Sequence, residues 1–361
     1  MPGRKTVKPQ AWAEVLKSKY ATVPLKQDEV WVAAVQMNPV TIDPARPQKG
    51  ITRNLEHMLE LCDATCAYPL RRPELLVFPE FTLNGFDNRW TKKDWMRIAV
   101  MVPGPETDAI CKKAKELGAY IAFAAHTQQA DWPGHHSNSS ILVGPEGKVI
   151  HVHWKAYGGF PGTLEFGTTV HDVLDEFVER YGWDAVWPVA RTPIGNIATY
   201  VCSEGMVPET ARVFVHQGAE ILCRCIGGGG WGEQPGDQFI TQFRADCAFN
   251  QVYGIYSNGG SGATVNGRPV FETHRGGYSM VVDPGGGVVS QAGDSREQPV
   301  TAAIPIALLR QKHRIPRIRT EIYVPIYEKC PGYVPPNLYS KYVPQDVDDA
   351  LQYSLKNFRH V

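Results

Sequence analysis

The sequence has no net charge of either sign and no long apolar run. Lys plus Arg and Asp plus Glu each number 37, so the formal net charge at pH 7 is +0. A nucleic-acid binder that works through electrostatics would carry a basic excess. Apolar runs such as 120–125 are too short to cross a bilayer, and the basic residues of 1–11 precede no apolar stretch of a signal peptide. We therefore predict a soluble cytoplasmic protein with no nucleic-acid or membrane partner.

The sequence also lacks the cysteine pattern of a disulfide-rich protein. Eight cysteines are scattered over 361 residues, without the density of a disulfide scaffold. We expect most of them to be small buried apolar residues in a reducing cytoplasm. With 43% hydrophobic and 10% aromatic residues, the chain can build a sizeable core, which excludes disorder for most of its length.

The chain carries one order of predicted elements twice. Runs of branched and small apolar residues predict strands, and apolar residues at helical spacing predict helices between them. The first half has predicted strands at 30–36, 75–78 and 120–125, helices at 51–66 and 106–117, and a hairpin of 140–143 with 148–153. The second half has predicted strands at 197–201, 220–224 and 252–257, helices at 208–218 and 237–250, and a hairpin of 278–283 with 288–290. Two such halves predict one α/β domain in which two sheets pack together with helices outside.

Two extensions and one insertion depart from this repeat. Residues 1–28 are a predicted N-terminal extension, residues 29–304 the repeated domain, and residues 305–361 a C-terminal extension with a short helix near 346–357. The C-terminal extension is rich in Pro and Tyr, so we expect it to pack on its own domain or on a neighbouring subunit. The insertion at 157–187 is long for a connection in a compact domain, and such loops are often functional.

Three reactive side chains stand where predicted strands end. Glu80, Lys155 and Cys202 follow the strand patterns LLVF, VIHVHW and IATYV. Side chains just past strand ends converge on one crevice in stacked α/β architectures. A carboxylate there can take the proton of a thiol, the thiolate can attack a carbonyl or nitrile carbon, and an ammonium can stabilise the negative charge that develops.

Each of these residues also has an ordinary structural explanation. A single cysteine at a strand end is more often part of the core than a nucleophile. Isolated glutamates such as Glu80 are usually solvated, and a lysine such as Lys155 commonly pairs with a nearby acid. The conjunction of all three at equivalent edges of a duplicated fold favours catalysis.

The segments around these residues resemble the nitrilase superfamily of carbon–nitrogen hydrolases. The matching segments span roughly residues 30–305 in the order of the family, and they are AVQMNP, FPEFTLNGF, MVPGPETD, VHWK, YVCSEGMVPETARVFVHQGAEIL and GYSMVVDPGG. The resemblance implies a four-layer α-β-β-α sandwich of two pseudo-repeated halves. It also implies Glu80 as general base, Lys155 as oxyanion stabiliser and Cys202 as nucleophile. Family members often carry a second glutamate after the lysine, and Glu165 is the candidate here.

The residues after the cysteine indicate the branch of the family. Nitrilases typically show Cys-Trp-Glu, whereas Ser203 replaces that Trp here. The stretch from Cys202 to Glu209 is similar to the motif Cys-x-Asp-Gly-x-x-Pro-Glu of aliphatic amidases and formamidases, with Glu204 in place of Asp. The resemblance implies an amidase that hydrolyses a carboxylic amide to acid and ammonia or amine through a cysteine thioester, with no cofactor.

Other functions stay open at this point. A nitrilase is the first alternative. An N-carbamoyl amidohydrolase is the second, and Arg224 or Arg244 could bind its carboxylated substrate. A non-catalytic binding protein is the third. A metal site at His151 and His153 lacks a third ligand at a recognisable spacing, so we predict no metal.

Substrate contacts and assembly are predicted from weaker signals. The candidate substrate-binding residues are Ser203, Trp231 of the glycine-rich run 227–232, Tyr157 and Asn258. The aromatic C-terminal extension, together with the habit of the family of pairing subunits through such arms, predicts a homo-oligomer, a dimer or higher.

Overall fold

A computed structural model describes residues 20–67, 72–158, 166–227, 237–259, 263–265, 268–269, 276–312, 315–330 and 332–358 of the chain. Within these residues, two large sheets pack face to face. The first contains β1 (Val30–Gln36), β2 (Leu75–Val77), β4 (Val100–Met101), β5 (Tyr120–Gln128), β6 (Ser137–Gly144), β7 (Lys148–Trp154) and β16 (Gln298–Ile304). The second contains β8 (Ala190–Thr192), β9 (Gly195–Val201), β10 (Ile221–Ile226), β11 (Tyr253–Asn258), β14 (Met280–Val282) and β15 (Val288–Gln291).

The two sheets have the same strand order, as the duplicated sequence pattern requires. The first runs β16-β1-β2-β5-β6-β7 and the second β8-β9-β10-β11-β14-β15. In each, three parallel strands are followed by an antiparallel hairpin. Each also gains an antiparallel strand beside its first strand, β16 beside β1 and β8 beside β9.

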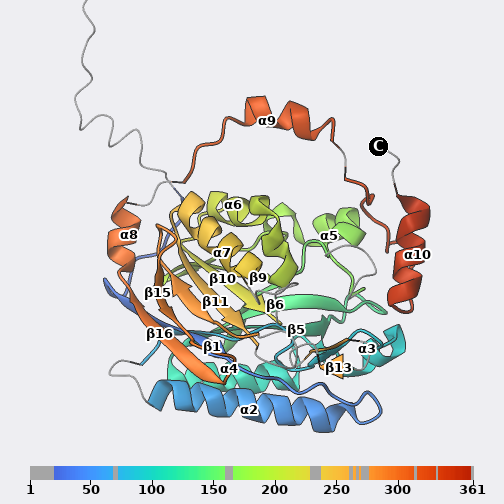
Figure 1. Cartoon of the computed structure of the whole chain (residues 1–361), viewed down its shortest axis with the longest axis horizontal. Helices are drawn as coiled ribbons and strands as arrows, with labels where there is room; N and C mark the ends of the chain where they lie inside the picture. The colour runs from blue at the N-terminus through green and yellow to red at the C-terminus, as the bar shows by residue number, and fades with distance from the viewer. Residues whose placement is uncertain are drawn as a thin grey trace, which may run out of the picture.

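Helices cover the outer faces of both sheets. Figure 1 shows α2 (Pro47–Ala67) and α4 (Pro105–Leu117) below the first sheet, and α6 (Pro208–His216) and α7 (Asp237–Asn250) above the second. One apolar cluster fills each interface between a sheet and its helices, and a third joins the two sheets through residues such as Val32, Val77, Ile197 and Ile255. The predicted four-layer α-β-β-α sandwich is confirmed.

The main elements missed by the sequence pattern are short or lie at edges. Strand β16 contains Pro299, and proline lowers the strand signal because it cannot donate to a ladder, although an edge strand tolerates it. The smaller elements include the three-stranded sheet of β3 (Phe86–Asp87), β12 (Ala263–Val265) and β13 (Arg268–Pro269). Further helices are α3 (Lys92–Ile98), α5 (Leu174–Tyr181), α8 (Ile306–Lys312), α9 (Thr320–Tyr327) and α10 (Val347–Asn357).

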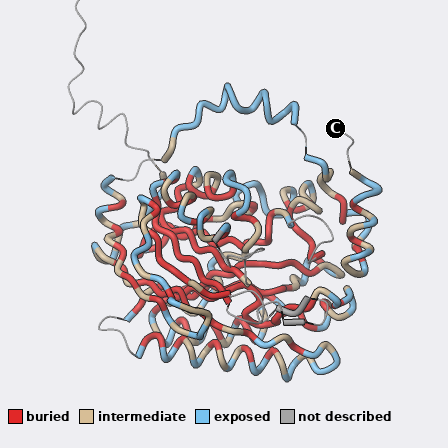
Figure 2. Tube along the Cα trace, in the orientation of Figure 1, coloured by how far each residue is buried: buried red, intermediate tan, exposed pale blue. Residues whose placement is uncertain are grey.

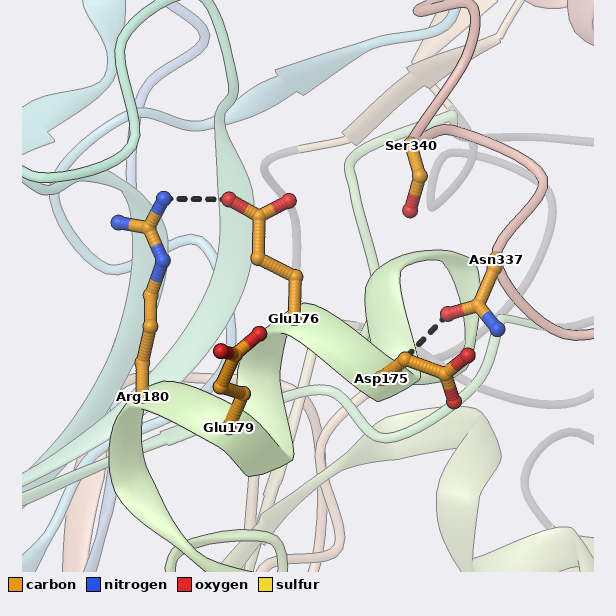
Figure 3. A pocket seen from close by; sticks show the side chains of 6 residues that line it. All are labelled: Asp175, Glu176, Glu179, Arg180, Asn337 and Ser340. Atoms are coloured by element: carbon orange, nitrogen blue, oxygen red, sulfur yellow. Dashed lines mark hydrogen bonds and ion pairs between the residues drawn. The ribbon is translucent and has the colours of Figure 1, made fainter.

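The insertion contains α5 and packs against the C-terminal extension. Phe177 of α5 joins Trp154, Leu338 and Tyr339 in an apolar cluster. At its rim, the backbone N–H of Asp175 donates to the side-chain oxygen of Asn337 over 2.8 Å (Figure 3). The pocket drawn there is lined by polar side chains of α5 and the C-terminal extension. The extension therefore packs on its own domain, one of the two predicted arrangements.

The segment between α8 and this docked part lies on the surface. No residue of α9 is buried, and Ile322, Ile326 and Tyr327 are exposed by 57% or more (Figure 2). The Tyr327 hydroxyl of α9 donates to the Glu209 carboxylate of α6 over 2.9 Å. Among the described residues, no helix has the length and apolar character that a membrane span needs.

Candidate active site

Glu80 is a buried carboxylate held by neighbours from both sheets. It lies just after β2, and its side chain is 2% exposed. Its Oε1 accepts a hydrogen bond of 2.7 Å from Nδ2 of Asn138 on β6. Its Oε2 accepts one of 2.9 Å from the backbone N–H of Gly227 after β10. These donors fix the orientation of the carboxylate in the interior.

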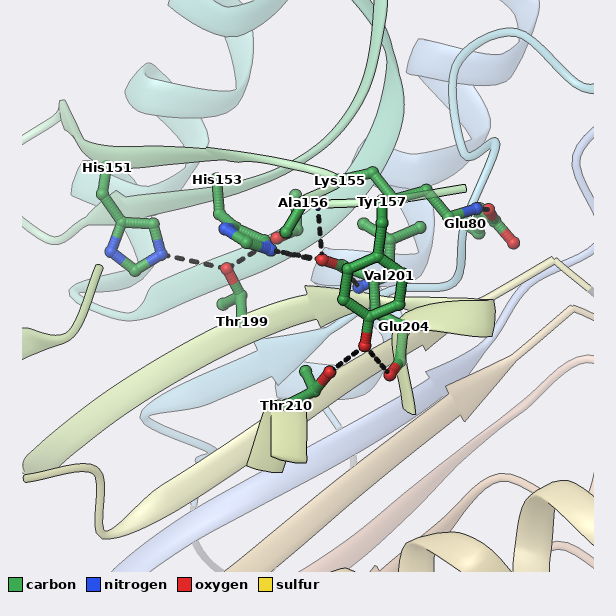
Figure 4. A network of polar contacts seen from close by, with 11 residues as sticks. Glu80, His151, His153, Lys155, Ala156, Tyr157, Thr199, Val201, Glu204 and Thr210 are labelled. Carbon is green, nitrogen blue, oxygen red and sulfur yellow. Dashed lines mark hydrogen bonds and ion pairs between the residues drawn. The ribbon is translucent and has the colours of Figure 1, made fainter. Parts of the chain in front are cut away.

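Lys155 directly follows β7 and faces this carboxylate. Its side chain is 3% exposed, and its Nζ lies 3.5 Å from Oε1 of Glu80 (Figure 4). The backbone N–H of Lys155 donates to the carbonyl oxygen of Asn138 over 2.8 Å. Asn138 therefore holds Glu80 through its side chain and Lys155 through its backbone. The two charges compensate each other, as buried charges must.

Cys202 completes the group from the second sheet. It follows β9 at a positive φ of 42° and keeps intermediate exposure, whereas six of the other cysteines are buried. Its thiol is hydrogen-bonded to the Glu80 carboxyl. Burial raises the pKa of the Cys202 thiol, the charge of Glu80 raises it further, and the charges of Lys155 and Arg224 offset part of that rise. The resting group is thus a thiol, and a thiol needs a base before it can attack.

The arginines considered for a carboxylated substrate are engaged elsewhere. Arg224 is fully buried, and its Nε and Nη2 donate to the carbonyl oxygen of Cys202 over 3.0 and 2.7 Å. Nε of Arg244 donates to the carbonyl oxygen of Gly286 over 2.9 Å. Both side chains use these donors within the protein, which weighs against the N-carbamoyl alternative.

Of the other predicted substrate residues, two make hydrogen bonds within the protein, one has a buried hydroxyl without a partner among the described residues, and two lie outside the described residues. The Tyr157 hydroxyl donates to the Glu204 carbonyl oxygen over 2.8 Å and also contacts the Thr210 hydroxyl. The Asn258 amide donates to the Gly277 carbonyl oxygen over 3.0 Å. The Ser203 hydroxyl is buried and makes no hydrogen bond to the described residues. Glu165 and Trp231 lie outside the described residues. Substrate contact by any of these residues stays a prediction.

The strand histidines make hydrogen bonds within the protein. Nε2 of His151 bonds to the Thr199 hydroxyl over 2.9 Å, and Nε2 of His153 bonds to the Glu204 carboxylate over 3.0 Å. Burial, and after it the charge of His153, lowers the pKa of His151 to about 3. Across the described part of the chain, no three His, Cys, Asp or Glu side chains gather as a metal ion would require.

Sequence reasoning missed two residues that hold the Glu80 carboxylate. Asn138 gave no signal, because one asparagine within an apolar strand has no recognisable pattern. Gly227 is the first residue of the glycine-rich run in which Trp231 alone was predicted to contact substrate, and the structure shows why glycine is needed there. A Cβ on Gly227 would lie 2.4 Å from the ring of Phe81 and 2.9 Å from Oε2 of Glu80.

Comparison with known proteins shows the family to which the chain belongs. The family model described as carbon-nitrogen hydrolase matches residues 31–314. The chain is 28% identical to a formamidase of Helicobacter acinonychis (strain Sheeba) over 230 residues. That alignment covers 63% of this chain and 61% of the relative. It is 27% identical to a formamidase of Bacillus cereus (strain Q1) over 269 residues, and that alignment covers 70% of this chain and 72% of the relative.

Solved structures share the fold at low sequence identity. An amidase from Nesterenkonia sp. superposes with a TM-score of 0.57 at 15% identity, over 85% of this chain and all of that one. Nit3 of Saccharomyces cerevisiae, a member of the nitrilase superfamily, superposes with a TM-score of 0.56 at 17% identity, over 83% of this chain and 99% of that one. These likenesses support the four-layer architecture independently of the sequence motifs.

Proposed function

The chain belongs to the carbon–nitrogen hydrolase family, and from this premise we propose that it hydrolyses a carboxylic amide to an acid and ammonia or an amine through a thioester on Cys202. The family match confirms the predicted membership of the carbon–nitrogen hydrolases. The formamidases among the relatives support the amidase- and formamidase-like branch. The observation that carries the proposed mechanism is that Glu80, Lys155 and Cys202 follow three separate strands and yet lie together, with the Lys155 ammonium and the Cys202 thiol both beside the Glu80 carboxylate.

In the acylation step, Glu80 takes the proton of the Cys202 thiol as the sulfur attacks the amide carbon. A C–S bond forms, and the carbonyl π electrons move onto oxygen. The Lys155 ammonium stabilises that oxyanion. When the oxyanion collapses, the C–N bond breaks, and the nitrogen leaves as ammonia or amine with the proton that Glu80 held.

In the deacylation step, water attacks the thioester carbon. Glu80 takes a proton from the water, the C–S bond breaks, and the sulfur recovers a proton to give back the thiol. The sum of both steps is amide plus water to carboxylic acid plus ammonia or amine. Every proton moves between groups of the protein and the substrate, so the sequence of steps calls for no cofactor.

An acyl adduct on Cys202 tests this proposal. The protein would be mixed with a panel of small amides, formamide included, quenched in acid and measured as an intact chain by mass spectrometry. We expect an added acyl mass on the wild type and on Cys330→Ala, and neither adduct nor turnover with Cys202→Ala. Cys330 is the matched control because it is the exposed cysteine. Full turnover by Cys202→Ala would end the proposal, and faster ammonia release from the matching nitriles would favour a nitrilase.

We further propose that the chain forms a homo-oligomer through the segment around α9. Its Ile322 and Ile326 are 62% and 57% exposed and lie one helical turn apart on α9, and exposed apolar side chains on one face of a helix are suited to contact with another subunit. Light scattering of the double variant Ile322→Lys with Ile326→Lys should give a lower mass than the wild type, while Val289→Lys on the exposed hairpin keeps it. A wild type of 40.1 kDa in solution contradicts this proposal.

The division at residues 28 and 304 and the cytoplasmic location also stay proposals. All eight cysteines are unpaired, as a reducing compartment would keep them. Helix α8 begins directly after the proposed boundary at residue 304, and its Ile306 and Leu309 belong to the core between the sheets. A chain ending at 304 would expose that core, whereas a chain ending after α8 keeps it covered.

A further inference from the structure

Glu204 is a fully buried carboxylate that the proposed mechanism does not use. Its Oε1 accepts a hydrogen bond of 2.7 Å from the backbone N–H of Ala156, and its Oε2 accepts one of 2.7 Å from the backbone N–H of Val201. Nε2 of His153 lies 3.0 Å from Oε1 and 3.2 Å from Oε2. Figure 4 shows these donors around the carboxylate.

The two backbone donors flank the residues that would react. Ala156 directly follows Lys155, and Val201 directly precedes Cys202. Their strands, β7 and β9, belong to different sheets, so they share no ladder of backbone hydrogen bonds. The Glu204 carboxylate therefore forms a direct polar link between the strand end that bears Lys155 and the turn that bears Cys202.

The turn is also held from its other side. Arg224 of β10 binds the Cys202 carbonyl oxygen through two donors. On the side of Lys155, the Tyr157 hydroxyl binds the Glu204 carbonyl oxygen and so adds a second contact between that segment and the turn. Gly205 allows the approach of Arg224, because a Cβ there would lie 2.4 Å from the guanidinium carbon. With Arg224 holding the backbone of the turn, the Glu204 carboxylate is the contact that joins the residue after Lys155 to the residue before Cys202 through their backbone N–H groups.

We propose that Glu204 is a positioning residue for amide hydrolysis, whose carboxylate sets the distance between the Lys155 ammonium and the Cys202 sulfur. The inference rests on the proposed function, because that distance matters only if Lys155 stabilises an oxyanion formed by attack of Cys202. A displacement of about 1 Å between reacting groups can cost about 100-fold in rate. Glu204 touches neither substrate nor reacting atoms in this role.

Two variants of Glu204 and one matched control test this role. Glu204→Gln keeps the size of the side chain but has one acceptor oxygen in place of two. Its amide N–H₂ would therefore face the N–H of Ala156 or of Val201, and two donors cannot bond to each other. Glu204→Asp keeps both acceptors but is shorter by one methylene, about 1.5 Å. Glu220→Gln removes another fully buried carboxylate that accepts a backbone N–H, that of Asn196, at the opposite end of β9.

The decisive readout compares two reactions of the same thiol. One is amide turnover, which needs Lys155 near the developing oxyanion. The other is transfer of a methylthio group from methyl methanethiosulfonate to Cys202, which forms a disulfide, releases methanesulfinate and passes through no tetrahedral oxyanion on carbon. Both would be measured in the Cys330→Ala background at a temperature where circular dichroism shows each variant folded.

For Glu204→Gln we expect kcat to fall about 10- to 100-fold, with KM and the methylthiolation rate within about threefold of the wild type. Glu204→Asp should recover part of the lost kcat, and Glu220→Gln should keep the kcat of the wild type. The proposal is overturned by an unchanged kcat, by a change confined to KM, or by equal losses in both reactions. If Glu204→Gln does not fold, Glu204→Asp is judged by the same difference between the reactions.

Failure of this inference can be told apart from failure of the proposed function. If Cys202→Ala keeps its turnover, the proposed function falls and Glu204 has no role to play in it. If Cys202→Ala is inactive while Glu204→Gln turns over as the wild type does, the proposed function stands and the positioning role alone is lost.

Discussion

Two buried glutamates bind the two ends of strand β9 and have different partners. Glu204 accepts the backbone N–H of Val201 at the carboxyl end, and Glu220 accepts that of Asn196 at the amino end, over 2.7 and 2.8 Å. These two donors are five positions apart along the strand, a span of about 16 Å. Both carboxylates are fully buried.

Glu220 connects the flanking segments of the chain to the sheet. Arg310 of α8 donates to both of its oxygens over 2.8 and 2.7 Å, and the Tyr20 hydroxyl donates to Oε1 over 2.7 Å. Burial by itself would raise the pKa of Glu220, but the hydrogen bonds from Arg310, Tyr20 and the Asn196 N–H together outweigh it and lower the pKa.

The difference lies in what each carboxylate holds together. Glu220 joins segments on either side of the repeated domain, which affects whether the chain stays folded. Glu204 joins the neighbours of Lys155 and Cys202, which affects how the reacting groups face each other. Burial and a backbone partner are common to both, so neither feature by itself identifies a functional glutamate.

The largest expected effect is on kcat/KM, from substitution of Glu80, the proposed general base at the carboxyl ends of the strands. We expect Glu80→Gln to lower kcat/KM by about 10²- to 10⁴-fold, the usual contribution of a positioned base, because the Cys202 thiol would keep its proton. Steady-state ammonia release measures this. Glu220→Gln is the control at the other end, and a similar loss there would remove the distinction between the two ends.

The next largest effect should be on the free energy of unfolding, from a change at the amino end of β9. Arg310→Met leaves the buried Glu220 carboxylate without its cation, so we expect the free energy of unfolding to fall by about 3 kcal/mol. Denaturant titration followed by fluorescence measures the change. The kcat of the folded variant at 25 °C should equal that of the wild type, and a tenfold loss of kcat would contradict a purely structural role.

A smaller effect is expected at Gly205. A Cβ in Gly205→Ala would collide with the Arg224 guanidinium and displace it from the Cys202 carbonyl oxygen. We expect kcat to fall about tenfold, equivalent to about 1.4 kcal/mol. Gly118→Ala is the matched control, since a Cβ at that positive-φ position meets nothing within 4 Å. It should cost about 1 kcal/mol of stability and leave kcat unchanged.

The smallest effect should be the acid dependence of stability at Glu220. Its pKa in the folded protein is lowered, so its contribution is present above the ordinary value of 4.5 and is lost as pH falls through the folded pKa. Thermal unfolding between pH 7 and pH 3 should therefore show a shallower acid loss for Glu220→Gln than for the wild type. Equal slopes for both proteins would mean that this network does not set the acid stability.

Much of the fold could be predicted because its signals are local. Strand β1 begins and ends where the apolar run predicts, and the hairpins follow from glycine-rich turns between apolar runs. The insertion was predicted as a long loop, and α5 was missed because its apolar face is completed by Leu338 and Tyr339 from the far end of the chain. Strand β16 was missed because its proline weakens the strand signal and its partner β1 lies far away in sequence.

The sequence by itself determined which chemistry is available, since residue types and motif order mark Glu80, Lys155 and Cys202 wherever the chain folds. Only the tertiary structure decided which groups hold them, because Asn138, Gly227, Arg224 and Glu204 act through contacts between residues 22 to 147 positions apart or between strands of different sheets. Distances of that kind arise when the two sheets pack. No local pattern of residues records them.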